Sequence, residues 1–447
     1  MKADIITDKQ QWNDFIATST GCNITQTYEW GELLKFRNDE VLPIGVLNDE
    51  GQLCAAMLII ISRISVLPTP YFYAPRGPVI EDPNSEAMAI LLAFTRAEAR
   101  KRHAFMLKIE PGVTTEDQTW PQALKKHGFV SNPEARHLRH EWVLDLRPDE
   151  TKLMAGMKKT WRYCVRLAGR KDVTVRIGND EKDLDIFYQL LNTTSDRDSF
   201  FIYGKDFYQQ LLELYGDRAR LLIAEYEGQP LGAALLIAHG RWCWYMYGAS
   251  SNEQRDRMPN HLLQWTAFQW AKQQGCWYYN FRGIPDILEE GQPMWGVYVF
   301  KSGFGGYAMR AMETQDQAYI PVIYTLYRRL LQARLWYNNR KAQKQLVIAE
   351  QKKAAIKQEQ KNKEQKENAP QVSPEPATKQ AEPAATSGQS REKPARTKTP
   401  KTPMETQVPE TPAEPKVPET PTKPEVPETP QPETPAEQSS TEKAAAE

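Results

Sequence analysis

The sequence predicts an α/β protein of the mixed α+β kind, with two similar units in tandem followed by a basic helix and a disordered tail. Three observations predict this arrangement. The order strand, strand, strand, helix, strand is recognisable between Val41 and Pro111, and it returns between Arg220 and Ile284. The last aromatic residue is Tyr337, so about a quarter of the chain lacks the large apolar side chains that a core needs.

The first unit begins with two apolar runs that indicate a β-hairpin. VLPIGVLND and QLCAAMLIIIS are joined around Glu50 and Gly51, and YFYAPRGPVI is expected to be the third strand. SEAMAILLAFTRAEARKR has the spacing of an amphipathic helix, with Ser85 as its N-cap candidate. FMLKIEP then closes the unit as a strand.

The second unit repeats this order. RLLIAEYEG and PLGAALLIAHG flank a turn at Gly228, RWCWYMYGAS follows as a strand, NHLLQWTAFQWAKQQG is a helix, and CWYYNFRGI is a strand. The letters EGQ followed by LCAAMLI in the first unit match EGQ, one proline and LGAALLI in the second. We interpret this as an internal duplication whose two clefts face one another or share a groove. A chance likeness of two common hairpins is the alternative.

The remaining segments are expected to be mostly helical. TKLMAGMKKTWRYCVRLAGR at 151–170 predicts a basic amphipathic helix, and EKDLDIFYQLLNTT and KDFYQQLLELYG predict two more. The apolar run before Lys301 in GVYVFKSGFGG is expected to be a strand, and another amphipathic helix is expected from Ile320. The expected domains are 1–145, completed by part of 305–345, then 146–304, a C-terminal segment with the basic helix over 305–366, and the tail over 367–447.

The formal net charge of zero conceals three zones. Residues 1–327 carry 36 bases and 40 acids, residues 328–366 carry 12 and 3, and residues 367–447 carry 9 and 14, so the zones have net charges of −4, +9 and −5. The basic zone predicts an anionic partner, either membrane headgroups or nucleic acid. A solvated lysine-rich helix is the alternative.

The tail has the composition of a linker. Residues 370–447 contain 17 of the 32 prolines, and VPETP recurs at 408–412, 417–421 and 426–430. A nine-residue period of polar and proline residues cannot bury a core, which favours disorder over a repeat fold.

The sequence contains no pattern for a metal or a covalent nucleophile. The five cysteines are odd in number and in no CxxC or Cys/His ligand spacing, so neither disulfides nor zinc are expected. His137 and His140 form the one close histidine pair, without acids at zinc-site spacing, and there is no GxSxG. The start MKADIITDKQQW has no apolar signal region, and the longest apolar stretch, 53–62, is too short to span a bilayer. A cytoplasmic protein is therefore expected.

Cationic and aromatic side chains stand beside glycine or proline at several places. They are Lys35 in YEWGELLKFR, Arg76 in YAPRGPV, Tyr245 and Tyr247 in WYMYGAS, and Lys301 in VFKSGFGG. Lys35 can equally lie on a solvated helix face, and the two tyrosines can equally be packing residues. Lys301 is the most informative, because neighbouring glycines let the backbone approach a ligand closely.

Each β-β-β-α-β unit resembles the core of the acetyltransferase fold with GCN5-type topology. In that fold, users of acetyl-CoA place backbone N–H groups of a glycine-rich turn, ahead of the helix, against the pyrophosphate. The corresponding segments here, DPNSEAM at 82–88 and RDRMPNHLL at 255–263, contain no glycine. An acetyl-CoA pocket is therefore not expected, although the scaffold could still perform acyl transfer.

Several motifs together resemble the FemABX family of aminoacyl-tRNA-dependent peptidyltransferases, which build the peptidoglycan cross-bridge. They are YEWGELLK, YAPRGPV, LKIEP, the EGQPLGAALL hairpin with WYMYGAS, and above all VYVFKSGFGG. The likeness covers about residues 1–340. It implies two acetyltransferase-like (GNAT-like) domains, a groove for a muropeptide precursor that is either lipid-linked or nucleotide-linked, and aminoacyl-tRNA as co-substrate, with no cofactor, metal or DNA. Some members carry a long helical-hairpin arm, and 146–215 has no stretch for one, which indicates an armless member.

The resemblance also implies which residues do the chemistry. The reaction is aminolysis of an activated ester, so positioning and stabilisation of the carbonyl oxyanion should dominate. Lys301 is expected to supply a fixed ammonium group, or else to clamp phosphate at the tRNA 3′ end. Phe300 is expected to flank it as a packing or stacking surface.

In the family, a lysine near the N-terminus and an arginine of the second domain hold the precursor's phosphates. Lys35 matches the lysine. SFFIYGKDFYQQL has Tyr203 and Lys205 where the arginine is expected, so Lys205 or Arg197 replaces it, or the phosphate is held differently. The residues expected to line the groove for stem peptide or sugar are Tyr73, Arg76, Tyr245 and Tyr247.

The leading hypothesis is an enzyme that adds one or more amino acids from tRNA to the stem peptide of a peptidoglycan precursor. One alternative is an acetyl-CoA-dependent N-acetyltransferase, which the missing glycine turn disfavours. Another is a non-catalytic protein whose paired domains dock a cell-wall assembly while the tail recruits partners. In each case 328–366 could contact the inner face of the membrane, or bind the tRNA backbone.

Overall fold

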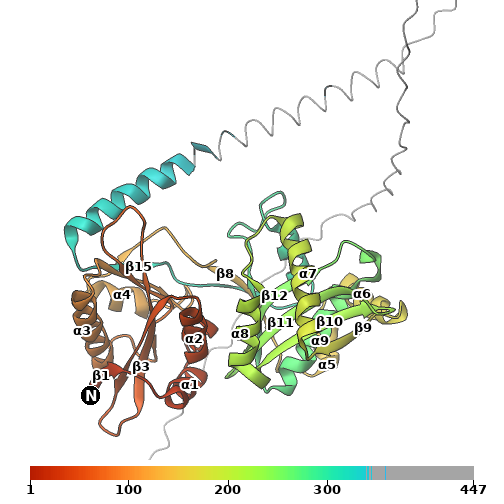
Figure 1. The fold of residues 1–447 in the computed structure, drawn as a ribbon, viewed down its shortest axis with the longest axis horizontal. Coiled ribbons are helices and arrows are strands. Elements are labelled where there is room, and N and C mark those ends of the chain that lie inside the picture. The colour runs from red at the N-terminus through yellow and green to blue at the C-terminus, as the bar shows by residue number, and fades with distance from the viewer. Residues whose placement is uncertain (339, 342–343, 345–357, 359–447) are drawn as a thin grey trace, which may run out of the picture. The chain divides into compact units, whose positions relative to one another are not determined.

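A computed structural model of the chain describes residues 1–338, 340–341, 344 and 358 (Figure 1). The tail expected at 367–447 and most of the basic helix expected at 328–366 lie outside the described residues. The described part consists of two β-sheets with helices on both faces of each. Together they confirm the predicted α/β class.

The first sheet has eight strands, seven of them in one path. Its order is β1 (Lys2–Ile5), β2 (Glu40–Leu47), β3 (Leu53–Ser62), β4 (Tyr71–Arg76), β6 (Met106–Pro111), β15 (Gln315–Ala318) and β7 (Val130–Ser131), and β5 (Val79–Ile80) pairs with β3.

The second sheet has seven strands. Its order is β14 (Tyr307–Arg310), β8 (His140–Asp145), β13 (Tyr278–Gly283), β12 (Trp242–Ser250), β11 (Gln229–His239), β10 (Ala219–Tyr226) and β9 (Thr174–Gly178).

Helices cover both sheets. Those of the first part of the chain are α1 (Lys9–Thr18), the 3-10 helix η1 (Ile24–Gln26), α2 (Tyr28–Phe36), α3 (Glu86–Lys101) and α4 (Thr119–Lys126). Those of the second part are α5 (Glu150–Gly156), α6 (Lys159–Arg170), α7 (Glu181–Asp198), α8 (Lys205–Tyr215), η2 (Gly216–Arg218), η3 (Arg255–Arg257), α9 (Pro259–Gln273) and α10 (Trp295–Ser302). Residues 321–338 form a further helix.

The repeated β-β-β-α-β order is confirmed. It consists of β2, β3, β4, α3 and β6 in the first unit and of β10, β11, β12, α9 and β13 in the second, and in both units the last two strands pair in parallel. The turn between β10 and β11 is the two-residue Glu227-Gly228, in which both residues have positive φ. This is the turn geometry whose twist matches a β-hairpin, and glycine adopts it without strain.

The strands are apolar on both sides because both sheet faces are covered. The outer face of the first sheet packs on α3 and α4, and the outer face of the second packs on α6 and α9. The two inner faces share one core, to which α1 and α2 contribute from the first unit and α7 and α8 from the second (Figure 1). Buried members of this shared core include Trp12, Ile16, Leu33, Phe207 and Leu211.

A buried polar network joins the two units beside this core. Glu29 of α2 has no exposed surface, and its Oε1 accepts a 2.5 Å hydrogen bond from Nη2 of Arg218. Burial raises the pKa of Glu29, but the Arg218 charge outweighs it and the net shift is downward. Nδ1 of His239 accepts from Arg218, and burial with the Arg218 charge lowers the pKa of His239 to about 4, so the ring is neutral. These contacts connect the two units.

The expected secondary structure needs correction at two segments. The basic segment 151–170 is two helices, because the N–H of Lys158 donates to the carbonyl oxygen of Gly303 at 2.9 Å instead of continuing the helix. The apolar run before Lys301 is the helix α10, not a strand. Positions 295, 298 and 301 have the three-residue spacing of one helix face, which the short apolar run concealed.

The strand β8 pairs with β13 and β14 in the second sheet, although it precedes the expected boundary after residue 145. Residues 315–318, near the other end of the chain, pair in the first sheet. The strand β8 therefore belongs to the second sheet, and residues 315–318, from within the segment 305–345, belong to the first. In the segment 146–215 no helix exceeds the 18 residues of α7, as expected for an armless chain.

Candidate active site

Lys301 lies in the last turn of α10 with its side chain almost wholly buried. Its Nζ donates a 2.7 Å hydrogen bond to the carbonyl oxygen of Gly283, at the end of β13. Burial and then the neighbouring Arg282 charge lower the pKa of Lys301 to about 7, although the Glu141 carboxylate acts in the opposite direction. Its ammonium group therefore exchanges its proton near neutral pH, which suits catalytic use.

Glu141 of β8 connects Arg76 of the first sheet to the second sheet. Nη2 of Arg76 donates to Oε1 of Glu141 and to the carbonyl oxygen of Leu138, both at 2.7 Å. Nδ2 of Asn280 donates to Oε2 of Glu141, also at 2.7 Å. Burial raises the pKa of Glu141, but the Arg76 charge and the Asn280 amide outweigh it and the net shift is downward. Glu141 is therefore a fixed anion between the cations Arg76 and Lys301.

Aromatic rings form a wall beside Lys301. The His261 ring centroid lies 5.6 Å from that of Trp161, 5.4 Å from that of Phe300 and 5.9 Å from that of Phe304. Burial lowers the pKa of His261 to about 4, so its ring is neutral at physiological pH. Because of these neighbours, Phe300 is a packing residue of an aromatic cluster next to Lys301.

The glycines after Lys301 allow α6 to approach. A Cβ atom on Gly303 would lie 2.1 Å from Cε2 of Trp161, so no larger residue fits there without displacing the indole. Nε1 of Trp161 donates to the carbonyl oxygen of Phe300 at 3.0 Å. The start of α6 is thereby attached to the segment that holds Lys301.

Lys301 lies where two parallel strands separate. The strands β12 and β13 pair over three positions, from Trp242 opposite Tyr278 to Trp244 opposite Asn280. The equivalent strands β4 and β6 pair over five. Gly283, which accepts from Lys301, lies beyond the paired part. The strand edges beside Lys301 are therefore not paired with each other, unlike those of the first unit.

The structure does not bring Tyr245 and Tyr247 to one surface. The register between β11 and β12 shifts at Met246, and this extra residue places the two tyrosines on opposite faces of the sheet. Tyr245 packs in the core under α9, and burial raises its pKa to about 12. Tyr247 packs on the inner face, with its ring centroid 4.9 Å from that of Tyr208. The two-residue period of a strand predicted one face, and the bulge breaks that period.

Lys35 lies on the exposed side of α2 and makes no ion pair with any residue in the described part of the chain. Two residues later, the guanidinium carbon of Arg37 lies 4.6 Å from the ring centroid of Tyr203. The Tyr203 ring in turn stacks on Phe207 at 4.1 Å. The cation Arg37 of the first unit is thus held against an aromatic ring of the second.

Arg197 and Lys205, the two expected substitutes for the phosphate-binding arginine, are already engaged. Arg197 donates to Oδ2 of Asp198 and to Oδ1 of Asn252, both at 2.9 Å. Nζ of Lys205 lies 2.5 Å from Asp185, on α7. Their charges are compensated locally, in contrast with that of Lys35.

Tyr73 is 2% exposed, and its hydroxyl group is used within the first unit. The hydroxyl donates to Oε2 of Glu110 at 2.7 Å and lies 2.6 Å from Nδ1 of His137. Burial raises the pKa of Tyr73 well above its ordinary value. A role for Tyr73 in substrate binding stays a prediction, since the hydroxyl would have to leave these partners.

A row of aromatic side chains on the inner face runs from Tyr247 to the α2 end of the site. The charges of Arg282 and Arg37 both act on the hydroxyl of Tyr247, whose pKa burial raises. Tyr247 contacts Phe207 with 6.5 Å between ring centroids, and Phe207 stacks on Tyr203. This row ends at Arg37, whose guanidinium carbon lies 4.6 Å from the ring centroid of Tyr203.

Sequence reasoning missed several of these residues. Arg37 follows Lys35 by two positions, and Arg282 precedes a glycine at the end of an apolar strand, so both carried a local signal. Glu141 carried none, because its partner Arg76 is 65 residues away. Also missed were Trp161, His261 and Asn280.

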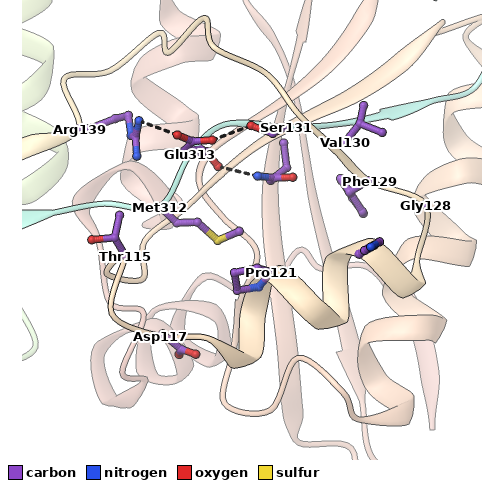
Figure 2. Close-up of a pocket in the computed structure, with 12 residues that line it drawn as sticks. Thr115, Asp117, Pro121, Gly128, Phe129, Val130, Ser131, Arg139, Met312 and Glu313 are labelled. Atoms are coloured by element: carbon purple, nitrogen blue, oxygen red, sulfur yellow. Dashed lines mark hydrogen bonds and ion pairs between the residues drawn. The ribbon is translucent and has the colours of Figure 1, made fainter.

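One cavity of about 750 Å³ lies in the first unit and contains none of the predicted site residues (Figure 2). Thr115, Asp117 and Met312 line it, and Glu313 lies there between Arg139, at 3.5 Å, and the hydroxyl of Ser131, at 2.7 Å. Its acids and cations compensate each other. Cavity size therefore does not identify the reaction site.

A second cavity, of about 480 Å³, opens between the two units. Trp242, Trp244 and Tyr278 line it together with residues 17–20, at the end of α1, and the loop residues 112–114. Asn280, the hydrogen-bond partner of Glu141, forms part of its wall. This aromatic cavity therefore shares the side chain of Asn280 with the Glu141 network.

None of the helices in the described ranges is long and apolar enough to cross a membrane.

Comparison with known proteins identifies the family. The sequence matches the FemAB family over residues 7–229 and 225–332. The "Lipid II:glycine glycyltransferase" of Staphylococcus aureus (strain MRSA252) is 25% identical over 395 residues, which covers 71% of this chain and 93% of the relative. The same protein of Staphylococcus aureus strain USA300 matches equally, with 25% identity over 395 residues.

Among solved structures, the crystal structure of FemX has a TM-score of 0.68 at 21% identity, and the match covers 73% of this chain and 99% of that one. This likeness confirms the fold of two tandem GNAT-like domains. Because the family match extends over well more than half of the sequence, the chain belongs to the FemAB family of transferases.

Proposed function

We propose that this chain transfers an aminoacyl group from aminoacyl-tRNA to the side-chain amine of the third residue in the stem peptide of a peptidoglycan precursor. Lipid II is the precursor that the names of the staphylococcal relatives favour. The reaction takes place on the cytoplasmic side of the membrane, where charged tRNA is present. It builds the cross-bridge of the cell wall.

The observation that carries the proposal is the buried Lys301 ammonium group beside an unpaired strand edge. It is anchored on the carbonyl oxygen of Gly283 at 2.7 Å, and the cation Arg282 and the anion Glu141 are near enough to act on its pKa. A preorganised cation in a poorly solvated site stabilises developing negative charge far better than one in water.

The chemistry requires no protein nucleophile. The amine nitrogen of the stem peptide attacks the carbonyl carbon of the ester, a C–N bond forms, and the carbonyl oxygen gains negative charge that Lys301 stabilises. The C–O bond to the tRNA ribose then breaks. The proton lost by the amine ends on the ribose oxygen, so the products are an amide and uncharged tRNA.

The α2 end of the site is suited to the precursor's diphosphate. Lys35 is exposed there, and Arg37 presents its guanidinium over the ring of Tyr203. Arg37 is the cation that we assign in place of Lys205 or Arg197. Its acid partner Asp39 lies 3.8 Å away, whereas the acid partners of Lys205 and Arg197 lie at 2.5 and 2.9 Å. Its planar guanidinium can bind phosphate with two hydrogen bonds. From this end, aromatic side chains run from Tyr203 through Phe207 to Tyr247.

The start of α9 disfavours acetyl-CoA as the donor. In acetyl-CoA users the pyrophosphate accepts from backbone N–H groups at this position. Here the first helical residue is Pro259, which has no N–H, and no glycine precedes it in the turn 255–258. The segment thus supplies fewer donors than such a cradle requires.

The test uses the purified full-length protein with lipid II and tRNA charged with glycine, alanine or serine in turn. The expected result is a mass increase of the stem peptide by one or more aminoacyl residues with at least one of the donors. Lys301→Ala should abolish this mass increase, while the thermal melting curve of the variant should still show a folded protein. A wild-type protein that transfers nothing from any charged tRNA, but acetylates the peptide from acetyl-CoA, would contradict the proposal.

A second comparison addresses the non-catalytic alternative. A chain ending at residue 345 lacks the tail but contains both sheets. If the protein were only a docking module, neither form would turn over substrate. We expect equal turnover by both forms with a soluble precursor analogue.

A further inference from the structure

Helix α6 (Lys159–Arg170) carries cations and no acids. Between residues 151 and 171 there are seven lysines and arginines and no aspartate or glutamate. Lys152 pairs with Asp149, and Lys171 pairs with Asp256. The other cations make no ion pair with any residue that the structure describes, and they are Lys158, Lys159, Arg162, Arg166 and Arg170.

Four exposed side chains form one stripe along this helix. Lys159, Tyr163, Arg166 and Arg170 follow one another at steps of four, three and four residues, so they share a face. At 1.5 Å per residue the stripe is about 16 Å long. The opposite face is buried on α9, and its buried residues are Cys164, Val165 and Ala168.

A hollow lies beside the stripe. It has a volume of about 620 Å³, and its lining includes Arg162, Arg166 and the half-buried indole of Trp265 on α9. The one acid of the lining, Glu150, accepts a 2.9 Å hydrogen bond from Nε2 of Gln269. Nη1 of Arg162 donates to the carbonyl oxygens of Ala155 and Met157 at 2.7 and 2.6 Å, which fixes this guanidinium at the rim. An aromatic face between arginines is the arrangement that binds nucleotides by stacking and by phosphate contact.

The stripe begins at the reaction centre. Trp161 donates to the carbonyl oxygen of Phe300, and the N–H of Lys158 donates to that of Gly303, so the first turn of α6 is attached on both sides of Lys301. A polyanion that extends from Lys301 towards α6 therefore reaches the cations of this helix directly after the first turn.

We propose that the α6 stripe, together with the hollow at Trp265, binds the phosphate backbone of the tRNA acceptor stem while the aminoacylated 3′ end lies at Lys301. The inference rests on the proposed aminoacyl-tRNA donor and adds to it the surface on which the RNA lies. The contacts are to phosphates, which position the RNA and carry no sequence information directly.

A membrane surface fits the same charges less well. A helix that binds a bilayer buries an apolar face among the headgroups. The apolar face of α6 is already packed on α9, and the exposed face carries three cations and one tyrosine. RNA phosphates need only the exposed cations.

The experiment measures binding of uncharged bacterial tRNA to the full-length protein by fluorescence anisotropy over a series of salt concentrations. The variant carries Lys159→Ala, Arg166→Ala and Arg170→Ala, and alanine preserves the helix. The matched control carries Arg100→Ala, Lys125→Ala and Lys126→Ala, three exposed cations on and near the outer helices of the first unit. We expect tRNA affinity to fall on the order of 10- to 100-fold in the variant, with the salt slope flatter by about one per lost contact, and to be preserved in the control.

A kinetic comparison separates this inference from the proposed function. Two donors are used, full-length charged tRNA and an aminoacylated trinucleotide that ends in CCA and has no stem. The ratio of their kcat/KM values should fall in the α6 variant and not in the control. Wild-type tRNA binding without any aminoacyl transfer would contradict the proposed function alone.

Unchanged tRNA affinity and an unchanged donor ratio in the α6 variant would overturn the inference even if transfer occurs. So would a variant that keeps its tRNA affinity and loses only its binding to phosphatidylglycerol vesicles, because α6 would then be a membrane contact. Circular dichroism melts of both variants ensure that lost binding does not reflect lost structure.

Discussion

The Nζ atom of Lys301 on α10 donates a 2.7 Å hydrogen bond to the carbonyl oxygen of Gly283 at the end of β13. This contact fixes a cation next to the point where β12 and β13 separate, with Glu141 and Arg282 nearby. The anchoring carbonyl belongs to the backbone, so it is present whatever the protonation state of the neighbouring acids. The catalytic predictions depend on this arrangement.

The charge on Lys301 should govern the rate. Lys301→Ala is expected to lower kcat on the order of 10²- to 10³-fold, the usual effect of removing one preorganised donor to an oxyanion. Because the pKa of Lys301 is about 7, the Lys301-dependent rate of the wild type should fall as pH rises through this value and the ammonium loses its proton. Lys301→Arg, which stays charged, should show no such fall. A rate that instead rises through pH 7 only when Lys301 is present would assign it the role of a base.

The same lysine should make the fold less stable at low pH. The pKa of Lys301 is about 7 in the folded protein and has its ordinary value of 10.5 in the unfolded chain. Below pH 7 both the folded and the unfolded states hold the proton, and the folded state bears the free-energy cost of the buried charge. Between pH 7 and 10.5 the unfolded state holds more protons, so the free energy of unfolding rises with pH. Lys301→Met should therefore raise the urea midpoint most below pH 7 and progressively less towards pH 10.5. Equal effects at all pH values would contradict this.

Precursor binding should depend on the α2 end of the site. Lys35→Ala and Arg37→Ala are each expected to raise KM for the precursor about tenfold or more, since a hydrogen bond to a charged group contributes about 1.5–3 kcal/mol. Lys205→Ala and Arg197→Ala serve as controls, because each removes the same single positive charge. Acids already bind these two side chains. Initial rates at varied precursor concentration measure the effect. A larger KM change for the controls than for Arg37→Ala would reject the assignment.

Removing the charge of Glu141 should destabilise the junction of the two sheets. Glu141→Gln leaves the buried Arg76 without its counter-ion, and breaking a buried pair in this way costs about 3–5 kcal/mol. The control is Glu134→Gln, whose partner Arg334 is mostly exposed, for which at most about 1 kcal/mol is expected. Equilibrium urea unfolding of both variants makes the comparison. Similar losses would mean that the Arg76 pair is not energetically distinct.

Replacing Gly303, the glycine after Ser302, should destabilise the fold and reduce transfer. Gly303→Ala places a Cβ atom 2.1 Å from the Trp161 ring, and we expect about 1–3 kcal/mol of destabilisation together with reduced transfer, because the Lys301 segment must move. Gly296→Ala, on the same helix, meets no atom within 4 Å, and alanine is the better helix former there. Thermal melts should show opposite signs for the two variants. A neutral Gly303→Ala would indicate that the indole moves aside freely.

The sequence by itself determined the periodic features of this protein. The β-β-β-α-β order appeared twice because strand and helix spacing are local properties, visible within a dozen residues. The glycine cluster around Lys301 and the exposed position of Lys35 are also local, and both were recognised from short motifs. The helix α10 was missed because an eight-residue apolar run has too few residues to distinguish a helix from a strand.

Only the tertiary structure decided which residues form the site. The pair of Arg76 with Glu141 spans 65 residues, and the contact of Arg37 with Tyr203 spans 166, so no local pattern could reveal either. One extra residue at Met246 separated Tyr245 from Tyr247, although the strand period had predicted a shared face. The physical reason is that side-chain spacing is set by the local backbone, whereas partners, burial and pKa values are set by whichever distant segments the packing brings together.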